Sequence, residues 1–190
     1  MNKNIIGIFE QANKHEYNSG LNWFGNAREI ASNMAKDYNI SLEKVAAIIS
    51  ILSPANNWQR NIIDADNVLN GWANGKTHEI VVTTYGRNKA KALKVLEDTN
   101  SNFTFPISSR YFKTLCFWDN IVDPNSDRVT VDRHAAKVYW GAKYAGAIDV
   151  RGKKYTMIEG SYIKTAKHLG MLPHQLQAIT WLTYKRLMNR

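Results

Sequence analysis

Asp132 is the residue whose type and position best suit chemistry. It follows a short apolar extended segment, and the pattern after it predicts a helix over 132–140. Aspartate commonly caps the first free amides of a helix, and those amides and the helix dipole would keep its carboxylate ionised. An ionised carboxylate on a rigid helix start is also what a reaction through a cationic sugar needs. Asp132 is therefore either a structural cap or a catalytic group.

Basic and aromatic residues favour a polyanionic partner. Lys and Arg number 25 against 16 Asp and Glu, which gives a formal net charge of +9, and the chain also has six Trp and nine Tyr. Phosphates that are neutralised by Lys or Arg release bound counterions, and flat rings stack on bases. The alternative is a solvated basic surface around an aromatic core. We expect a nucleic acid or a nucleotide as the partner.

The composition also excludes several classes of protein. A chain of 190 residues, 44% of them hydrophobic, suits one globular domain over 1–190 rather than a disordered chain. Its longest apolar run, 45–52, is too short to span a membrane, and we expect no secretory leader. The single Cys116 excludes an internal disulfide and a cysteine-held cluster, and the five histidines lack metal-ligand spacing. We therefore expect a cytoplasmic protein, monomeric by default, without a metal or another cofactor and without a membrane partner.

Helix-sized segments must position these groups. Ser41 is a suitable N-cap for a helix over 42–52, which is apolar on nearly every side and is expected to cross the core. Gly170 and Pro173 give the stop and start signals between the last two helices. Only 79–84 is strand-like, and it is either an isolated strand or an extended connector. The sequence predicts a compact all-α domain of about eight helices, drawn from the segments 4–14, 22–38, 42–52, 58–72, 88–96, 108–121, 132–140, 156–169 and 173–188.

The order of four motifs resembles a known superfamily. Val131-Asp132-Arg133-His134, followed by Ala135, Ala136 and Val138, resembles the motif around the catalytic aspartate of the helix–hairpin–helix DNA glycosylases, which have the endonuclease III-like fold. Segment 45–53 resembles their buried helix ending in Leu-Ser beside the base pocket, and 57–61 resembles the start of the helix after it. In 86–90, a Lys-Ala pair resembles the helix start before the hairpin. The resemblance covers a core of 43–141, with 1–40 and 155–190 as flanking helices.

The chain departs from this superfamily at the hairpin. The usual Leu-Pro-Gly-x-Gly is replaced by 107–113, which contains no glycine. Ser108, Ser109 and Arg110 at a helix start can still hold a phosphate. Bifunctional members carry a Schiff-base lysine just after the hairpin, and Lys113 lies near that place. We favour a solvated or phosphate-binding role for Lys113 over a catalytic one.

The resemblance implies a monofunctional DNA glycosylase that excises a modified or damaged base. In that mechanism Asp132 stabilises an oxocarbenium-like transition state and orients or deprotonates water. The target base is first extruded from the helix into a pocket. The residues expected to form the base pocket are Asn57, Trp58, Gln59 and Arg60, and those expected to contact phosphates are Arg87, Lys89, Arg133 and His134.

Structural alternatives exist for several of these residues. Trp58 suits a core anchor as well as a stacking platform. Arg60 has the spacing for a salt bridge to Asp64, one turn further along the helix. His134 suits a hydrogen-bond partner of Asp132 more than a base in its own right.

Two other functions remain open at this point. Small phage-encoded relatives with similar Leu-Ser-Pro, Trp-x-Arg-Asn and Asp-Arg-His elements suggest a phage enzyme that modifies a base or nucleotide on the same scaffold, in the host cytoplasm. The other function is that of a non-catalytic binder of nucleic acid or nucleotides. An Asp132→Asn variant separates the two enzymes from the binder.

Overall fold

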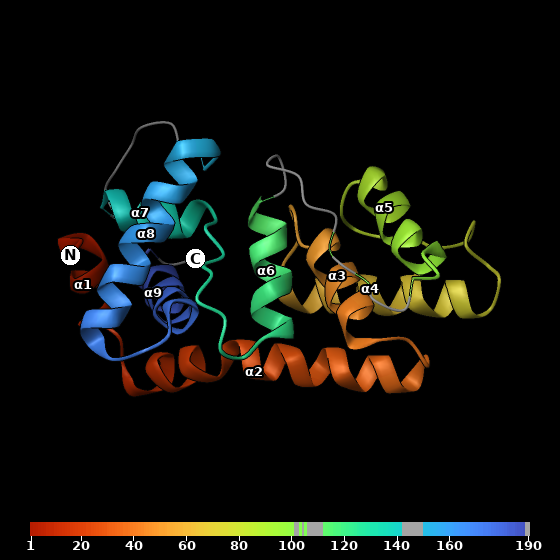
Figure 1. The fold of residues 1–190 in the computed structure, drawn as a ribbon, viewed down its shortest axis with the longest axis horizontal. Coiled ribbons are helices and arrows are strands. Elements are labelled where there is room, and N and C mark those ends of the chain that lie inside the picture. Colours follow the sequence, from red (N-terminus) through yellow and green to blue (C-terminus); the bar gives the residue numbers. More distant parts are fainter. Residues whose placement is uncertain (101–102, 104, 106–111, 142–149, 189–190) are drawn as a thin grey trace. The chain divides into compact units, whose positions relative to one another are not determined.

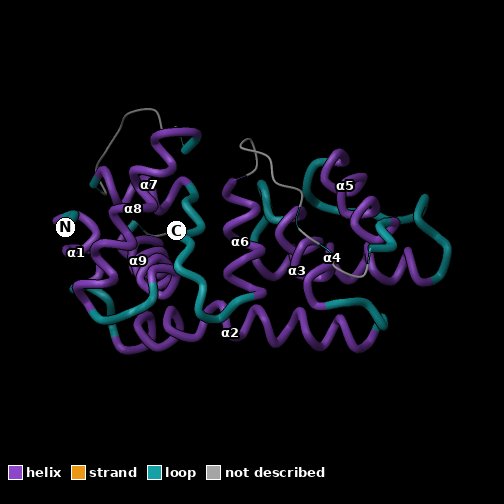
Figure 2. The backbone as a smooth tube through the Cα atoms, viewed as in Figure 1, coloured by secondary structure: helices purple, strands orange, loops and turns teal. Residues whose placement is uncertain are grey.

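The computed structural model describes residues 1–100, 103, 105, 112–141 and 150–188. All regular structure in these residues is helical, and Figure 2 shows helices joined by loops with no strand among them. The predicted all-α class is therefore confirmed. The helices of the described residues, labelled in Figure 1, are α1 (Lys3–Phe9), α2 (Lys14–Asp37), α3 (Leu42–Leu52), α4 (Trp58–Ala73), α5 (Gly86–Glu97), α6 (Phe112–Val122), α7 (Arg133–Trp140), α8 (Gly152–Leu169) and α9 (Pro173–Leu187).

The helices α3 and α4 begin where the sequence predicts them, each after a capping side chain. Ser41 Oγ accepts a hydrogen bond from the amide of Lys44 at the start of α3, at 3.4 Å. Asn57 Oδ1 accepts one from the amide of Arg60 at the start of α4, at 2.9 Å. Such caps satisfy amides that the helix itself leaves without a partner. Their local chemistry explains why these two helices begin as predicted.

The predicted boundary between the first two helices is wrong. A helix was expected over 4–14 and the next from residue 22, whereas α1 ends at Phe9 and α2 begins at Lys14. The reason is a reciprocal cap, because Glu16 donates its amide to Asn13 Oδ1 at 2.9 Å and its carboxylate accepts from the amide of Asn13 at 3.0 Å. This pair of hydrogen bonds starts α2 two turns early.

Two smaller differences concern 79–84 and α8. Residues 79–84 contain no strand and form a connector with a turn at its start and bends at its end, so of the two alternatives the isolated strand is wrong. Helix α8 begins at Gly152 instead of residue 156. Part of the predicted helix over 108–121 lies outside the described residues, and α6 is described from Phe112.

Residue contacts divide the chain into two compact units. Unit 1 consists of residues 1–26 and 107–190, and unit 2 consists of 27–106. In unit 1, helices α1, α7, α8 and α9 pack on one another, and in unit 2, α3 packs on α4 and α5 (Figure 1). Of the flanking segments expected around a core of 43–141, residues 1–26 and 155–190 thus join 107–141 in unit 1, whereas 27–40 belongs to unit 2. That the chain folds as a single domain stays a prediction.

Each unit has its own buried centre. In unit 2, residues 45–52 of α3 are all buried, as their apolar pattern predicts. In unit 1, the core surrounds Val129 and Val131, which are fully buried immediately before α7. Large side chains of α8 and α9, among them Tyr155, Ile158 and Tyr184, pack in the same cluster. The segment that leads to Asp132 therefore runs through the core of unit 1.

Candidate functional site

Asp132 is the N-cap of α7. Its backbone is extended, with φ −100° and ψ −174°, and its Oδ1 accepts a hydrogen bond from the amide of Ala135 at 2.8 Å. The second oxygen, Oδ2, lies 3.1 Å from Nδ1 of His134. The side chain is 22% exposed, so it is partly open to solvent. The predicted cap is confirmed.

The surroundings of Asp132 hold its carboxylate ionised. Burial alone raises the pKa of this group, since a charge is costly to remove from water. The hydrogen bond from His134 and the positive charge of Lys113 on α6 act in the opposite direction. Together with the amide of Ala135 they hold the pKa of Asp132 below its ordinary value. Asp132 is therefore negatively charged at neutral pH.

His134 is a direct partner of Asp132. Because an ionised carboxylate only accepts hydrogen bonds, Nδ1 of His134 is the atom that carries the proton between them. The imidazole also packs edge-on against the buried ring of Tyr184, with ring centroids 5.9 Å apart. The expected hydrogen-bond role is confirmed, and a phosphate contact stays a prediction. Arg133 is the exposed first residue of α7, where a phosphate can reach it.

The four residues expected to form the base pocket lie at the start of α4. Asn57 is the N-cap, Gln59 is exposed, and Trp58 is half-buried. Arg60 Nε lies 3.3 Å from Asp64 Oδ1, one turn further along α4, and donates a hydrogen bond to Thr83 Oγ1. The structural alternative for Arg60, a salt bridge to Asp64, is therefore confirmed.

Asp64 is the centre of this second group of side chains. It is fully buried and accepts from Nδ2 of Asn56 at 2.9 Å and from the amide of Thr83 at 2.8 Å. Ala55, just before Asn56, has a φ of +58°, which is strained for a residue with a side chain. The hydrogen bonds of Asp64 hold this strained turn against the connector that contains Thr83.

The other residues expected to contact phosphates differ in whether their charged groups already have a partner in the protein. The Arg87 guanidinium lies 4.8 Å from the ring centre of Tyr85, which is itself half exposed, and Arg87 is exposed at the start of α5. Lys89 Nζ instead donates to the carbonyl of Ile80 at 2.9 Å, so its amine already has a partner within unit 2. Ser108, Ser109 and Arg110, which were expected to hold a phosphate, lie outside the described residues.

The structure thus yields two clusters, one in each unit. Asp132, His134 and the charge of Lys113 come together in unit 1. Asn57, Arg60 and their partners come together at the start of α4 in unit 2.

A family model matches residues 1–187, which is nearly the whole chain, and its description is "family of unknown function (DUF7178)". The chain belongs to DUF7178. No curated protein and no solved structure matches the chain.

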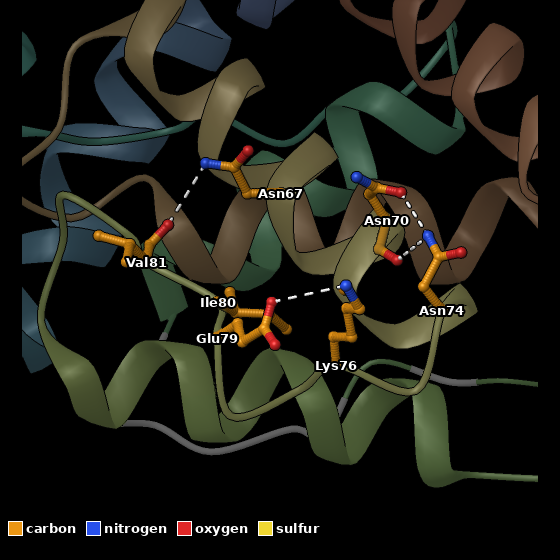
Figure 3. A pocket seen from close by; sticks show the side chains of 8 residues that line it. Asn67, Asn70, Asn74, Lys76, Glu79, Ile80 and Val81 are labelled. Atoms are coloured by element: carbon orange, nitrogen blue, oxygen red, sulfur yellow. Dashed lines mark hydrogen bonds and ion pairs between the residues drawn. The ribbon is translucent and has the colours of Figure 1, made fainter.

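This DUF7178 chain also has a hollow that the sequence did not indicate. It lies in unit 2 and has a volume of about 590 Å³. One wall is formed by Asn67 and Asn70 of α4 and by Asn74 directly after its end, and the other by residues of the connector over 76–81. Figure 3 shows Asn67 reaching the carbonyl of Val81 and Asn70 facing Asn74, whose side chain donates to Asn70 at 2.7 Å. In the sequence, only the spacing of the three asparagines could have indicated this hollow. None of the residues expected at a functional site lines it.

In the part of the chain that the structure describes, no group of three or more His, Cys, Asp or Glu side chains is placed to hold a metal ion. None of the helices in that part combines the length and the apolar character that crossing a membrane requires.

Proposed function

We propose that this chain is a monofunctional DNA glycosylase, which hydrolyses the N-glycosidic bond of a modified or damaged base. The observation that carries the proposal is the carboxylate of Asp132, which is ionised and fixed at the start of α7 by Ala135 and His134, on a side chain that is partly exposed. Breaking an N-glycosidic bond leaves positive charge on the sugar, and a fixed negative charge beside that sugar lowers the barrier.

The same carboxylate serves the attacking water. An ionised Asp132 accepts a hydrogen bond from water and takes its proton as the bond to the sugar forms. The hydrogen bond from His134 to Oδ2 restricts the orientation of the Asp132 carboxylate. Because the charge and its orientation exist before the substrate binds, little reorganisation is needed during the reaction.

Three features support DNA as the substrate. The formal net charge of +9 favours a polyanion, and Lys113, Arg133 and Arg87 offer cations for phosphates. Trp58, half-buried at the start of α4 in unit 2, offers an aromatic ring on which a base can stack. The order of the glycosylase-like motifs along the chain agrees with this assignment.

Replacing Asp132 by asparagine tests the proposal. Asparagine is as good an N-cap as aspartate and still accepts from the amide of Ala135, so the fold is retained while the charge is lost. We expect base release to fall by about a thousandfold, as for the loss of one electrostatic contact to a transition state. Duplex and single-stranded DNA from ordinary and hypermodified phage genomes would be incubated with the protein, and mass spectrometry would detect free bases.

Asp98→Asn is the matched control for this experiment. Asp98 also accepts a backbone amide, that of Asn100 at 2.9 Å, but it is exposed in unit 2 and is expected to leave base release unchanged. Equal base release by Asp132→Asn and the native protein would overturn the proposal. DNA binding without any base release by the native protein would identify a binder instead.

A further inference from the structure

The three residues before Asp132 form a tight, buried bend. Val129 and Val131 are fully buried and Thr130 is 7% exposed. The amide of Val131 donates to the carbonyl of Val129 at 2.9 Å, across Thr130. Such a three-residue turn has only one short internal hydrogen bond to keep its shape. Other groups must hold it if Asp132, the next residue, is to stay in one place.

Tyr155 of α8 closes both arms of this bend with one hydroxyl. Its OH donates to the carbonyl of Val129 at 2.7 Å and accepts from the amide of Val131 at 3.1 Å. The ring is 2% exposed and packs edge-on against Phe112, with centroids 4.9 Å apart. The packing of the ring therefore fixes the position of the hydroxyl beside the backbone of Val129 and Val131.

Glu159, one turn after Tyr155 on the same face of α8, holds the start of the bend. Its Oε1 accepts from the amide of Val129 at 3.3 Å and lies 3.8 Å from the thiol sulfur of Cys116. Burial raises the pKa of Glu159, against the amide of Val129 and the charge of Arg128, which lower it.

Asn120 holds the middle residue of the bend from α6. It lies one turn after Cys116, and its Nδ2 donates to Thr130 Oγ1 at 3.1 Å. Each of the three residues of the bend is therefore bound by a buried polar side chain. Helix α6 supplies Cys116 and Asn120, and α8 supplies Tyr155 and Glu159, in both cases four residues apart.

Buried polar groups are costly compared with apolar ones of the same size unless all their hydrogen bonds are made. The N-cap of α7 needs only the contact between Asp132 and Ala135. The buried polar side chains around the bend thus do more than start a helix. A catalytic group must be held within about 0.5 Å of its productive position, and a displacement of about 1 Å can cost about a hundredfold in rate.

We propose that Tyr155, Glu159 and Asn120 are positioning residues, which clamp the 129–131 bend so that the carboxylate of Asp132 keeps its catalytic orientation. Cys116 assists by donating its thiol hydrogen to Glu159. The inference rests on the proposed glycosylase function, because it assigns these side chains to the placement of that carboxylate.

Tyr155→Phe tests the clamp with the smallest possible change. The ring and its packing on Phe112 remain, and only the hydroxyl is lost. We expect kcat for base release to fall about tenfold or more while KM stays unchanged, because substrate binding does not use Tyr155. Tyr38→Phe is the control, since it removes a hydroxyl that donates to Asp66 Oδ1 at 2.7 Å in unit 2 and binds no residue of the bend. It is expected to retain the native kcat.

Two variants of Glu159 provide a second test. Gln retains an oxygen that accepts from the amide of Val129, whereas Leu does not. We expect Glu159→Gln to keep most of the native kcat and Glu159→Leu to lose about as much as Tyr155→Phe. Equal activity of the Gln and Leu variants would contradict the inference.

A third measurement does not depend on activity. The pKa of the Asp132 carboxyl can be followed by carbon NMR with labelled aspartate, and the Asp132→Asn variant assigns the signal. The groups that face Asp132 are His134 on α7, Lys113 on α6 and Tyr162 on α8, with Tyr184 of α9 behind His134. A looser bend weakens the bonds to the carboxylate, so Tyr155→Phe should raise this pKa towards its ordinary value, whereas Tyr38→Phe should not.

The outcomes separate this inference from the proposed function. An unchanged kcat and an unchanged pKa in Tyr155→Phe would overturn the clamp. Absence of base release by the native protein would overturn the glycosylase function, and the NMR measurement would still show whether the clamp fixes Asp132.

Discussion

The side chains around Asp132 combine two opposing effects on one carboxylate. Partial burial shields the group from water and so strengthens its field at a substrate. Burial by itself favours the neutral form and raises the pKa of Asp132, but the hydrogen bond from His134 and the charge of Lys113 lower it by more. Asp132 therefore stays ionised in partly buried surroundings, where electrostatic interactions are stronger than in water.

Lys113 is expected to act through its charge rather than as a nucleophile. Lys113→Gln removes the positive charge, which raises the pKa of Asp132, so that base release is lost at a higher pH when the solution is acidified. Lys113→Arg keeps the charge and should keep the native pH profile. The measurement is the rate of base release between about pH 3 and pH 8, around the ordinary carboxyl range.

Borohydride trapping tests the alternative, in which the amine of Lys113 reacts as a nucleophile. A Schiff-base lysine forms a covalent complex with DNA that borohydride makes permanent, and arginine cannot form it. We expect the native protein to give no trapped complex. A complex that forms with the native protein and disappears in Lys113→Arg would show that the amine itself reacts.

Within unit 2, Asp64 has the same role for the start of α4 that the clamp has for α7. It ties the turn at Asn56 to the connector at Thr83, while Arg60 covers it from the outer side. Asp64 is fully buried, whereas the side chain of Arg60 is 42% exposed. The two partners of this ion pair therefore contribute unequally to stability.

Substitutions on either side of this ion pair should show the difference. Asp64→Asn places an NH2 group against donors such as the amide of Thr83, and we expect the free energy of unfolding to fall by about 1–3 kcal/mol. Arg60→Gln removes a partly exposed cation and should cost about 1 kcal/mol or less. Urea denaturation followed by circular dichroism measures both. A larger cost for Arg60→Gln than for Asp64→Asn would contradict this account.

The start of a helix could be predicted from the sequence where an apolar pattern followed its capping residue. Helices α3 and α7 begin where Ser41 and Asp132 place them, because a cap acts within three residues. The early start of α2 also had a local signal, the pair Asn13 and Glu16, but no apolar pattern drew attention to it. The boundary between α1 and α2 was therefore missed, because the capping pair specifies it and the apolar pattern does not.

The candidate site divides in the same way. Asp132, its partner His134 and the pairing of Arg60 with Asp64 follow from spacings of two to four residues. Tyr155 binds residues 24 and 26 positions earlier, and Glu159 binds one 30 positions earlier. Their four-residue spacing places them on one face of α8, but sequence alone does not say what that face meets. The position and the hydrogen-bond partner of the Asp132 carboxylate were therefore foreseeable, and the distant residues that hold the segment before it were not.

At the level of the whole chain, the formal net charge of +9 makes salt the most informative variable for DNA binding. If about six phosphates are neutralised, the affinity for duplex DNA should fall about a thousandfold between 50 and 200 mM salt. Affinity for a mononucleotide should fall far less, because it carries few phosphates and no condensed counterions. Fluorescence anisotropy with a labelled duplex measures the slope, and a weak salt dependence would favour a small-nucleotide ligand over DNA.

A single cation refines this measurement. Arg87 is exposed beside Tyr85 at the start of α5, so Arg87→Gln should lower the magnitude of the slope of log affinity against log salt by about 1, the value for one lost phosphate contact. Lys76→Gln is the control, because Lys76 is equally exposed but lies near Glu79, 3.9 Å away, and was not expected to touch DNA. Since the two variants lose the same charge, a slope that changes equally in both would mean that Arg87 acts through net charge alone. A change confined to Arg87→Gln would place a phosphate at this end of α5.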